Sequence, residues 1–458
     1  MRAGTIVASN YLEMARLLAE SFLAQHPGDS FVVLVVDDQP VGDLGGTSDD
    51  DLAFEIIRLG DLALSDAQLD VMKTIYDVME LSTAVKPSFL QYLLRDDSIA
   101  VYLDPDIYVY GPFTELVAPV LQAGIVLTPH VLRPIPRDGT SPTERNIMGS
   151  GIFNLGFIAV SPDADDFLDW WQERLLVDAV SDIEANLFTD QRWIDWVPAL
   201  FGCQVCRDPA MNIAWWNIHE RDLRRTPDGD GYQVDGSPLR FVHFSGYDPA
   251  TPDRMSKHQT TPRTLHTEGA VIRELSDAYG AALEANGHHS RRRTPYEWNT
   301  TPQGRDLPAY VRACVRRALL HGERTGTEAG PLDTSVPMAF GPTADRFEDW
   351  LSEEIVGPDG ARINRTEKAL YDSRPDLQRA FPDLEGAGAT QYRDWLAHDP
   401  SAPDTLGDRW RPPVAVLTPP DAPVGLATPQ RSLARRVAGR ARRELVPYVE
   451  RARAKVGR

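Results

Sequence analysis

Cysteine, long apolar runs and glycine-rich phosphate loops are scarce in this chain of 458 residues. Its three cysteines cannot form a disulfide framework, so the chain requires no oxidising compartment. Cys203 and Cys206 form a CxxC pair, but only Cys314 remains, so sulfur alone cannot complete a four-ligand zinc site. We expect these thiols to be structural. The longest aliphatic run, 31–36, is far shorter than a membrane-spanning helix, and no targeting segment is visible. We therefore expect a cytoplasmic protein.

Basic residues are also fewer than acidic ones. The 47 lysines and arginines stand against 67 acidic residues, which gives a net charge of -20 and argues against a general nucleic-acid partner. The hydrophobic fraction of 42% and charged fraction of 25% are typical of globular proteins. Because the chain is longer than one hydrophobic core usually serves, we expect two domains, or one domain with a sizeable extension.

Strand-like and helix-like segments alternate over residues 1–290. This alternation predicts an α/β fold with a mostly parallel sheet flanked by helices on both faces. Ligands of such sheets bind beyond the carboxyl ends of the strands, so residues that follow strands are the functional candidates. The expected strands are 4–8, 30–36, 53–57, 99–103, 125–128, 151–160, 202–206 and 239–244, and the expected helices include 10–24, 83–94 and 163–176.

The remainder of the chain divides into segments of different composition. A polar, proline-containing stretch at 285–305 is typical of a linker, and 306–400 is expected to be a helical extension without strands, with Trp350 and Trp395 in its core. Recurrent proline makes 401–430 an extended tether. Residues 431–458 carry ten basic and two acidic side chains, and their apolar residues recur at helical spacing, which is typical of a basic amphipathic helix. Peripheral contact with an anionic membrane and a solvated or docked tail are both open interpretations.

The strongest chemical signal lies at the end of the aliphatic segment 99–103. Asp104 and Asp106 follow it, and two carboxylates that converge at a strand end repel each other unless a cation lies between them. Hard oxygen ligands suit Mg²⁺ or Mn²⁺, which neutralise a nucleotide diphosphate. His243 lies near the end of segment 239–244 and is a candidate nitrogen ligand, so the mixed set favours Mn²⁺.

Polar residues at other strand ends fit the same pocket. Asn154 lies in an otherwise apolar strand, where it needs hydrogen-bond partners such as a sugar hydroxyl or the backbone at a bulge. Asp190 and Gln191 open a helix-like stretch, in which Asp190 could equally be a helix N-cap. Lys86 could place a cation beside phosphate or carboxylate, or it could simply be solvated.

Taken in order, these motifs resemble the nucleotide-sugar glycosyltransferases with the GT-A fold, specifically the retaining family 8 group that includes glycogenin and lipopolysaccharide galactosyltransferases. The resemblance covers about residues 4–260 and includes the opening residues 6–11. The motifs that carry it are Tyr102-Leu103-Asp104-Pro105-Asp106-Ile107, Asn154-Leu155-Gly156, Asp190-Gln191 and His243-Phe244-Ser245-Gly246. It implies a GT-A catalytic domain over 1–290.

The resemblance also implies a role for each matching residue. Asp104, Asp106 and His243 would hold the metal, with Asp104 also near the ribose. That family usually has a lysine three residues after the glycine of the last motif, whereas this chain has Pro249 there. The remaining implied contacts with the nucleotide are Ala8, Asn10 and Tyr11 at the base and ribose, Gly246 and Lys257 or Lys86 at the phosphates, and Gly156 as a further residue that binds the nucleotide sugar. Asn154, Asp190 and Gln191 would hold the donor sugar and are the candidate catalytic residues.

The predicted function is transfer of a sugar from a nucleotide-diphosphate sugar to a glycan, lipid-linked or protein acceptor, with retention, in cell-surface glycan synthesis. The metal would stabilise charge on the leaving diphosphate. Two alternatives stay open: a non-catalytic sugar-binding scaffold and a sugar nucleotidyltransferase. Against the latter, no glycine-rich basic loop follows the first strand, and Walker and dinucleotide-binding motifs are absent.

Overall fold

The computed structural model describes residues 1–41, 52–267, 269–324, 332, 335–356, 362–384, 386–399 and 402. The chain divides into two compact units, Met1–Asn299 (unit 1) and Thr300–Arg458 (unit 2). Apart from Ala402, the expected tether and basic tail lie outside the described residues. No helix in the described ranges is long and apolar enough to cross a membrane.

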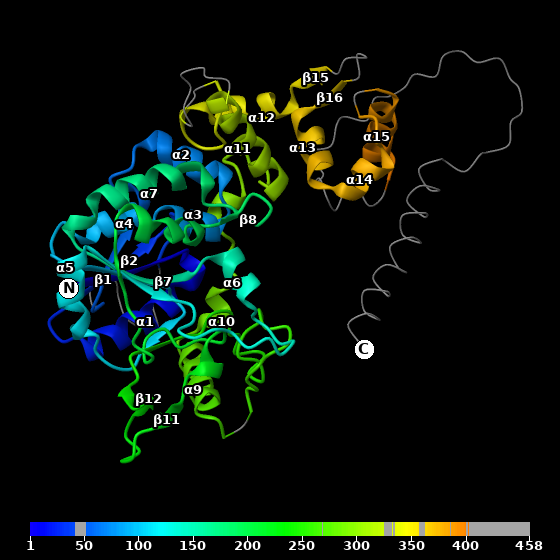
Figure 1. The fold of residues 1–458 in the computed structure, drawn as a ribbon. Helices are drawn as coiled ribbons and strands as arrows, with labels where there is room; N and C mark the ends of the chain where they lie inside the picture. Colours follow the sequence, from blue (N-terminus) through cyan, green and yellow to red (C-terminus); the bar gives the residue numbers. More distant parts are fainter. Residues whose placement is uncertain are drawn as a thin grey trace, which may run out of the picture. The chain divides into compact units, whose positions relative to one another are not determined.

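A seven-stranded sheet forms the centre of unit 1 (Figure 1), in the order β10-β6-β7-β4-β1-β2-β3. Neighbouring strands are parallel except around β7, which is antiparallel to both β4 and β6. The central strands are buried along almost their whole length, as expected for a sheet covered on both faces. The strands are β1 (Arg2–Val7), β2 (Ser30–Val35), β3 (Glu55–Arg58), β4 (Ala100–Leu103), β6 (Ile125–Pro129), β7 (Phe153–Val160) and β10 (Gln204–Val205).

Helices pack on both faces of this sheet, which confirms the predicted fold class. One layer contains α2 (Asp66–Ile75), α3 (Val78–Ala84), α4 (Lys86–Leu93) and α7 (Asp165–Asp178). The other contains α1 (Leu12–Gln25) and α5 (Val117–Ala123), and the apolar face of α1 closes the main core. Further helices of unit 1 are α6 (Glu144–Ser150), α8 (Val197–Leu200), α9 (Val271–Ala285) and α10 (His288–Arg291), with 3-10 turns that include η1 (Ser9–Tyr11), η6 (Gln191–Trp196) and η8 (Glu297–Asn299).

A short antiparallel ribbon beside the main sheet positions the functional site. It consists of β5 (Ile107–Val109) and β14 (Phe241–His243), and its register places His243 opposite Ile107. Segment 239–244 therefore forms a strand, but this strand is not part of the parallel sheet. Other small sheets in unit 1 are β8 (Ser181–Asp182) with β9 (Leu187–Phe188), and β11 (Leu223–Arg225) with β12 (Tyr232–Val234) and β13 (Ser237–Pro238).

The first part of segment 285–305, whose composition predicts a linker, packs on unit 1. The buried indole of Trp298 donates to the carbonyl of Val36 at 2.7 Å, and the Arg291 guanidinium donates to the carbonyl of Val41 at 2.6 Å. Arg291 also pairs with the buried Glu13 at 3.2 Å. The polar residues that suggest a linker thus make ion pairs and hydrogen bonds that fix this segment on unit 1.

Unit 2 is mainly helical, but it contains a hairpin that its sequence pattern does not predict. β15 (Glu354–Val356) and β16 (Arg362–Asn364) pair antiparallel. Trp395 is buried as expected, whereas Trp350 is only half-buried beneath the Arg365 guanidinium. The helices are α11 (Ala309–Arg324), α12 (Ala344–Ser352), α13 (Arg365–Ser373), α14 (Pro375–Ala380) and α15 (Ala387–His398).

Candidate functional site

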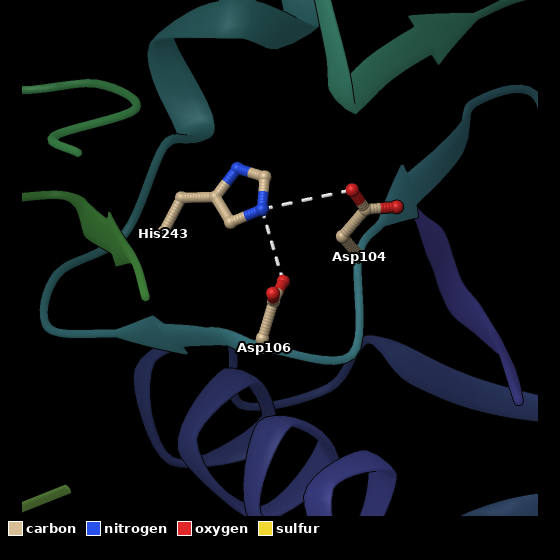
Figure 2. Close-up of side chains that lie close together, drawn as sticks. All are labelled: Asp104, Asp106 and His243. Carbon is tan, nitrogen blue, oxygen red and sulfur yellow. Dashed lines mark ion pairs between the residues drawn. The ribbon is translucent and has the colours of Figure 1, made fainter. Parts of the chain in front are cut away.

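The three expected metal ligands converge in unit 1 (Figure 2). Asp104 follows β4, Asp106 immediately precedes β5, and the ribbon register brings His243 beside them. His243 Nε2 lies 2.9 Å from Asp106 Oδ1 and 3.6 Å from Asp104 Oδ2. One ligand atom from each residue falls within 4.8 Å of the others. The side chains therefore form a compact set of two carboxylates and one imidazole.

The charges in this cluster favour a cation. Burial raises the pKa of Asp104 and outweighs the opposing effects of Lys86 and His243. Burial also acts to raise the pKa of Asp106, but the neighbouring His243 reverses this and leaves that pKa below its ordinary value. For His243, burial acts to lower the pKa, and Asp106 and Asp104 together raise it above the ordinary value. A positive charge between the two carboxylates is thus favoured, and a divalent ion would supply it.

The imidazole of His243 is held by its other ring nitrogen. Nδ1 lies 3.2 Å from Asn154 Oδ1, which also accepts from Asn212 Nδ2 at 3.1 Å. With the proton on Nδ1, the Nε2 lone pair faces the two carboxylates and is free to bind a metal. Asn154 therefore orients the histidine, and its partners are side chains rather than the backbone of a bulge.

Gln191 continues this buried network on the opposite side of Asn154. Its Oε1 accepts from Asn154 Nδ2 at 3.3 Å and from the backbone of Leu155 at 3.0 Å, and its Nε2 donates to the carbonyl of Ser150 at 2.8 Å. Both Asn154 and Gln191 are largely buried. The structure thus brings two of the three expected catalytic residues into contact.

Lys86 is buried rather than solvated, so that interpretation is wrong. Its ammonium lies 2.5 Å from Asp190 Oδ2, donates to the carbonyl of Leu155 at 3.0 Å, and lies over the ring of Tyr102 at 4.1 Å. Asp190 occupies the N-cap position of η6, but its side chain makes no capping hydrogen bond. The carboxylate instead pairs with Lys86, and the Tyr102 hydroxyl in turn donates to Asp104 Oδ1 at 2.8 Å.

The absence of a side chain at Gly156 leaves space for the His243 ring. A Cβ atom at this position would lie 2.4 Å from Cε1 of His243 and 2.9 Å from Oδ1 of Asn154, both impossibly short. Its carbonyl also accepts from the backbone of Asp104 at 2.9 Å. Gly156 therefore lies next to His243 and Asn154 on one side and binds the backbone of Asp104 through its carbonyl.

The expected nucleotide contacts follow the first strand. Ala8 is buried, Asn10 and Tyr11 are partly exposed in η1, and a second acidic residue, Asp37, lies next to them after β2. Asp37 Oδ2 accepts from both the backbone and the hydroxyl of Ser9 at 3.1 Å, and burial raises its pKa. Among the described residues, Asn10 Oδ1 and Asp37 Oδ1 are buried atoms without a hydrogen-bond partner. Two such acceptors invite a ligand with N–H or O–H groups.

Gly246 and Lys257 lie close together in the loop after β14. Gly246 has φ +69°, in the left-handed region that favours glycine, and its carbonyl accepts from the backbone of Lys257 at 2.8 Å. The Lys257 side chain is exposed. Unlike Lys86, it is therefore accessible to a phosphate.

Sequence reasoning missed several residues that shape this site. Asp37 could have been found, because it directly follows the strand expected at 30–36. His130 likewise follows β6; its Nδ1 lies 3.2 Å from the carbonyl of Ile152, and its Nε2 lies 3.5 Å from Asn154 Nδ2. Asn212 lies in no regular element, and its bond to Asn154 gave no signal in the sequence.

The chain is similar to a curated bacterial protein and to several solved structures. No family model matches the chain. The uncharacterised protein YfnF of Bacillus subtilis (strain 168) is 29% identical over 211 residues, which are 44% of this chain and 68% of YfnF. The galactosyltransferase LgtC, solved with donor and acceptor sugar analogues, matches at 16% identity over 65% of this chain and 99% of its own, with a TM-score of 0.38.

Two further solved structures are similar to the chain. The glycosyltransferase GlyE of Streptococcus pneumoniae TIGR4 matches at 12% identity over 63% of this chain and 64% of its own, with a TM-score of 0.36. Mouse xyloside xylosyltransferase 1 matches at 12% identity over 53% of this chain and 96% of its own, with a TM-score of 0.31. All three solved proteins are glycosyltransferases, the class that the sequence resembles. We base the function on the geometry of the site itself.

Proposed function

We propose that this chain is a metal-dependent glycosyltransferase that moves a sugar from a nucleotide-diphosphate sugar to a glycan, lipid-linked or protein acceptor. One observation carries the proposal: Asp104, Asp106 and His243 converge beside a buried network that runs through Asn154 to Gln191. The cluster supplies hard oxygen ligands and one imidazole, which suits Mn²⁺ or Mg²⁺. An ion held there would stabilise negative charge on the departing diphosphate.

The other residues of the chain bind and orient the donor in this proposal. The unpartnered oxygens Asn10 Oδ1 and Asp37 Oδ1 accept hydrogen bonds from the base and ribose, beside Ala8 and Tyr11. The other contacts assigned to the donor are the Gly246 backbone and Lys257 with the phosphates, Asp104 with the ribose, and Gln191, Asp190 and Asn154 with the sugar. Lys86 and Gly156 act indirectly, because Lys86 pairs with Asp190 and Gly156 makes room for His243.

Stereochemistry and cellular role are finer parts of the same proposal. Gln191 is the candidate to stabilise positive charge on the sugar, because its Oε1 belongs to the network that reaches His243. This arrangement is proposed to act with retention of configuration. We further propose that the enzyme works in the cytoplasm on cell-surface glycans, with the basic segment 431–458 at the inner face of the membrane.

A screen of donors tests the proposal. UDP-, GDP- and dTDP-sugars are incubated with the full chain, with and without Mn²⁺, and nucleotide release is measured, since slow donor hydrolysis can substitute for the acceptor. We expect metal-dependent release from one donor and a loss of at least 100-fold in Asp106→Asn. The matched control is Asp349→Asn, which changes an exposed aspartate on α12. If no donor is turned over and neither Mn²⁺ nor any donor binds by calorimetry, the chain is not this enzyme.

A further inference from the structure

The loop that follows Gly246 folds back and places a second histidine, His258, against that glycine. A Cβ at Gly246 would lie 2.5 Å from Cδ2 and 2.9 Å from Nε2 of His258, so the His258 ring lies directly against the glycine. Gly246 itself lies three residues after His243, and the backbone of Phe244, between them, donates to the carbonyl of Asp106 at 2.8 Å. Its side chain is nevertheless exposed to solvent.

Buried neighbours fix His258 in this position. Ser256 is fully buried, Met255 and Gln259 are nearly so, and the Ser256 hydroxyl accepts from the backbone of His258 at 3.1 Å. The backbone of Lys257 donates to the carbonyl of Gly246 at 2.8 Å, which ties the two parts of the loop together. The backbone of His258 is thus held by buried neighbours while its ring is exposed, as expected for a side chain that meets a ligand.

The far end of the same loop is tied to another segment of unit 1. The backbone of Ser141 donates to the carbonyl of Thr261 at 2.8 Å, and the Arg263 guanidinium pairs with Asp138 at 2.9 Å. The loop is therefore anchored on both sides of His258.

His258 is not a member of the metal-ligand set. Among the described residues, the only group of acidic, histidine or cysteine side chains close enough to share an ion consists of Asp104, Asp106 and His243. A ring beside this set, in contact with a glycine whose φ is positive, is suited to donate an N–H to an anionic group of a molecule that shares the ion.

We propose that His258 is a hydrogen-bond donor to the diphosphate of the donor substrate, beside Gly246. This inference rests on the proposed function, because it assigns one residue to the phosphates of that substrate. It gives the site a neutral donor in addition to the exposed cation of Lys257.

Calorimetry with two probes tests the assignment in the full chain. The probes are Mn²⁺ alone, and inorganic pyrophosphate in the presence of saturating Mn²⁺. For His258→Ala we expect an unchanged affinity for Mn²⁺ and an affinity for pyrophosphate that is weaker by about tenfold or more, the size of one hydrogen bond to a charged group. His258→Asn, which keeps an N–H donor, should restore part of the loss. The control is His398→Ala, an exposed histidine of unit 2.

Three results would overturn the assignment. Unchanged pyrophosphate binding in His258→Ala would show that the ring does not contact the diphosphate, while the proposed function would stand. A large loss of Mn²⁺ affinity in this variant would make His258 a metal ligand instead. If the unaltered chain binds neither probe, the proposed function fails as well.

Discussion

His243 contacts both aspartates through Nε2 and is held in place through Nδ1 by Asn154. A ligand whose orientation is fixed before the ion arrives loses less conformational entropy on binding. At the scale of single residues, the site therefore depends on the side chains that set the position of the imidazole as much as on the three ligands themselves.

The space at Gly156 gives a first prediction. In Gly156→Ala the new methyl group would collide with the His243 ring and with Asn154, so the ring must move away from the carboxylates. We expect Mn²⁺ affinity, measured by calorimetry, to fall by about tenfold to 100-fold. Gly60→Ala serves as a control for the loss of glycine, because Gly60 is exposed and a Cβ there meets nothing within 4 Å. Equal Mn²⁺ affinity in wild type and Gly156→Ala would show that the ring position is unimportant.

Buried His130 is predicted to make the free energy of unfolding depend on pH. Burial lowers the pKa of His130 to about 4, so this residue is neutral in the folded chain and binds a proton more readily once unfolded. Its contribution to stability is fully present above pH 6.5 and is lost as the pH falls from 6.5 towards 4. We expect this loss to be on the order of 3 kcal/mol. Denaturant unfolding at several pH values should give a flatter profile for His130→Gln, and identical profiles would contradict the assignment.

At the scale of secondary structure, the Lys86–Asp190 pair joins the start of α4 to the start of η6. Both charges are buried, so each depends on the other for compensation. Lys86 also donates to the carbonyl of Leu155, whose backbone N–H donates to Gln191 Oε1. These contacts and the ion pair hold the expected catalytic segment 190–191 against the sheet.

Removing one charge of the Lys86–Asp190 pair should destabilise the chain more than replacing both residues with apolar ones. We expect Lys86→Met to lower the free energy of unfolding by about 3–5 kcal/mol, because Asp190 would remain charged and buried. The double variant Lys86→Met with Asp190→Leu should recover most of this loss. Urea unfolding followed by circular dichroism measures both. A single variant as stable as wild type would mean that the ion pair does not form.

Secondary structure also shows how far the sequence could predict the molecule. The alternation of elements over 1–290 and the acids after segment 99–103 predicted the α/β sheet and its cluster of polar residues. The pairing of β14 with β5 could not be predicted, because the sequence of a three-residue strand does not show which other strand it pairs with. The sequence left the surroundings of Lys86 open between phosphate, carboxylate and solvent, because its partner lies over 100 positions away. The hairpin β15–β16 was not predicted because its strands are too short to show alternation.

At the scale of the whole molecule, all described side chains of the candidate site belong to unit 1. An ion that binds only the folded form of this unit must raise its stability by mass action. We predict that Mn²⁺ at 100 times its dissociation constant stabilises unit 1 by about 2.7 kcal/mol, seen as a higher unfolding temperature in calorimetry. Asp106→Asn should lose this shift and Asp349→Asn should keep it. A shift of equal size in Asp106→Asn would place the ion elsewhere.

The central claim, that Asp104, Asp106 and His243 hold a divalent ion, is tested most directly by crystals grown in Mn²⁺ and measured for anomalous scattering. The account predicts one strong peak within about 2.0–2.4 Å of His243 Nε2 and of an oxygen from each aspartate. Crystals in saturating Mn²⁺ that show no peak at this position, with the three side chains ordered, would contradict it.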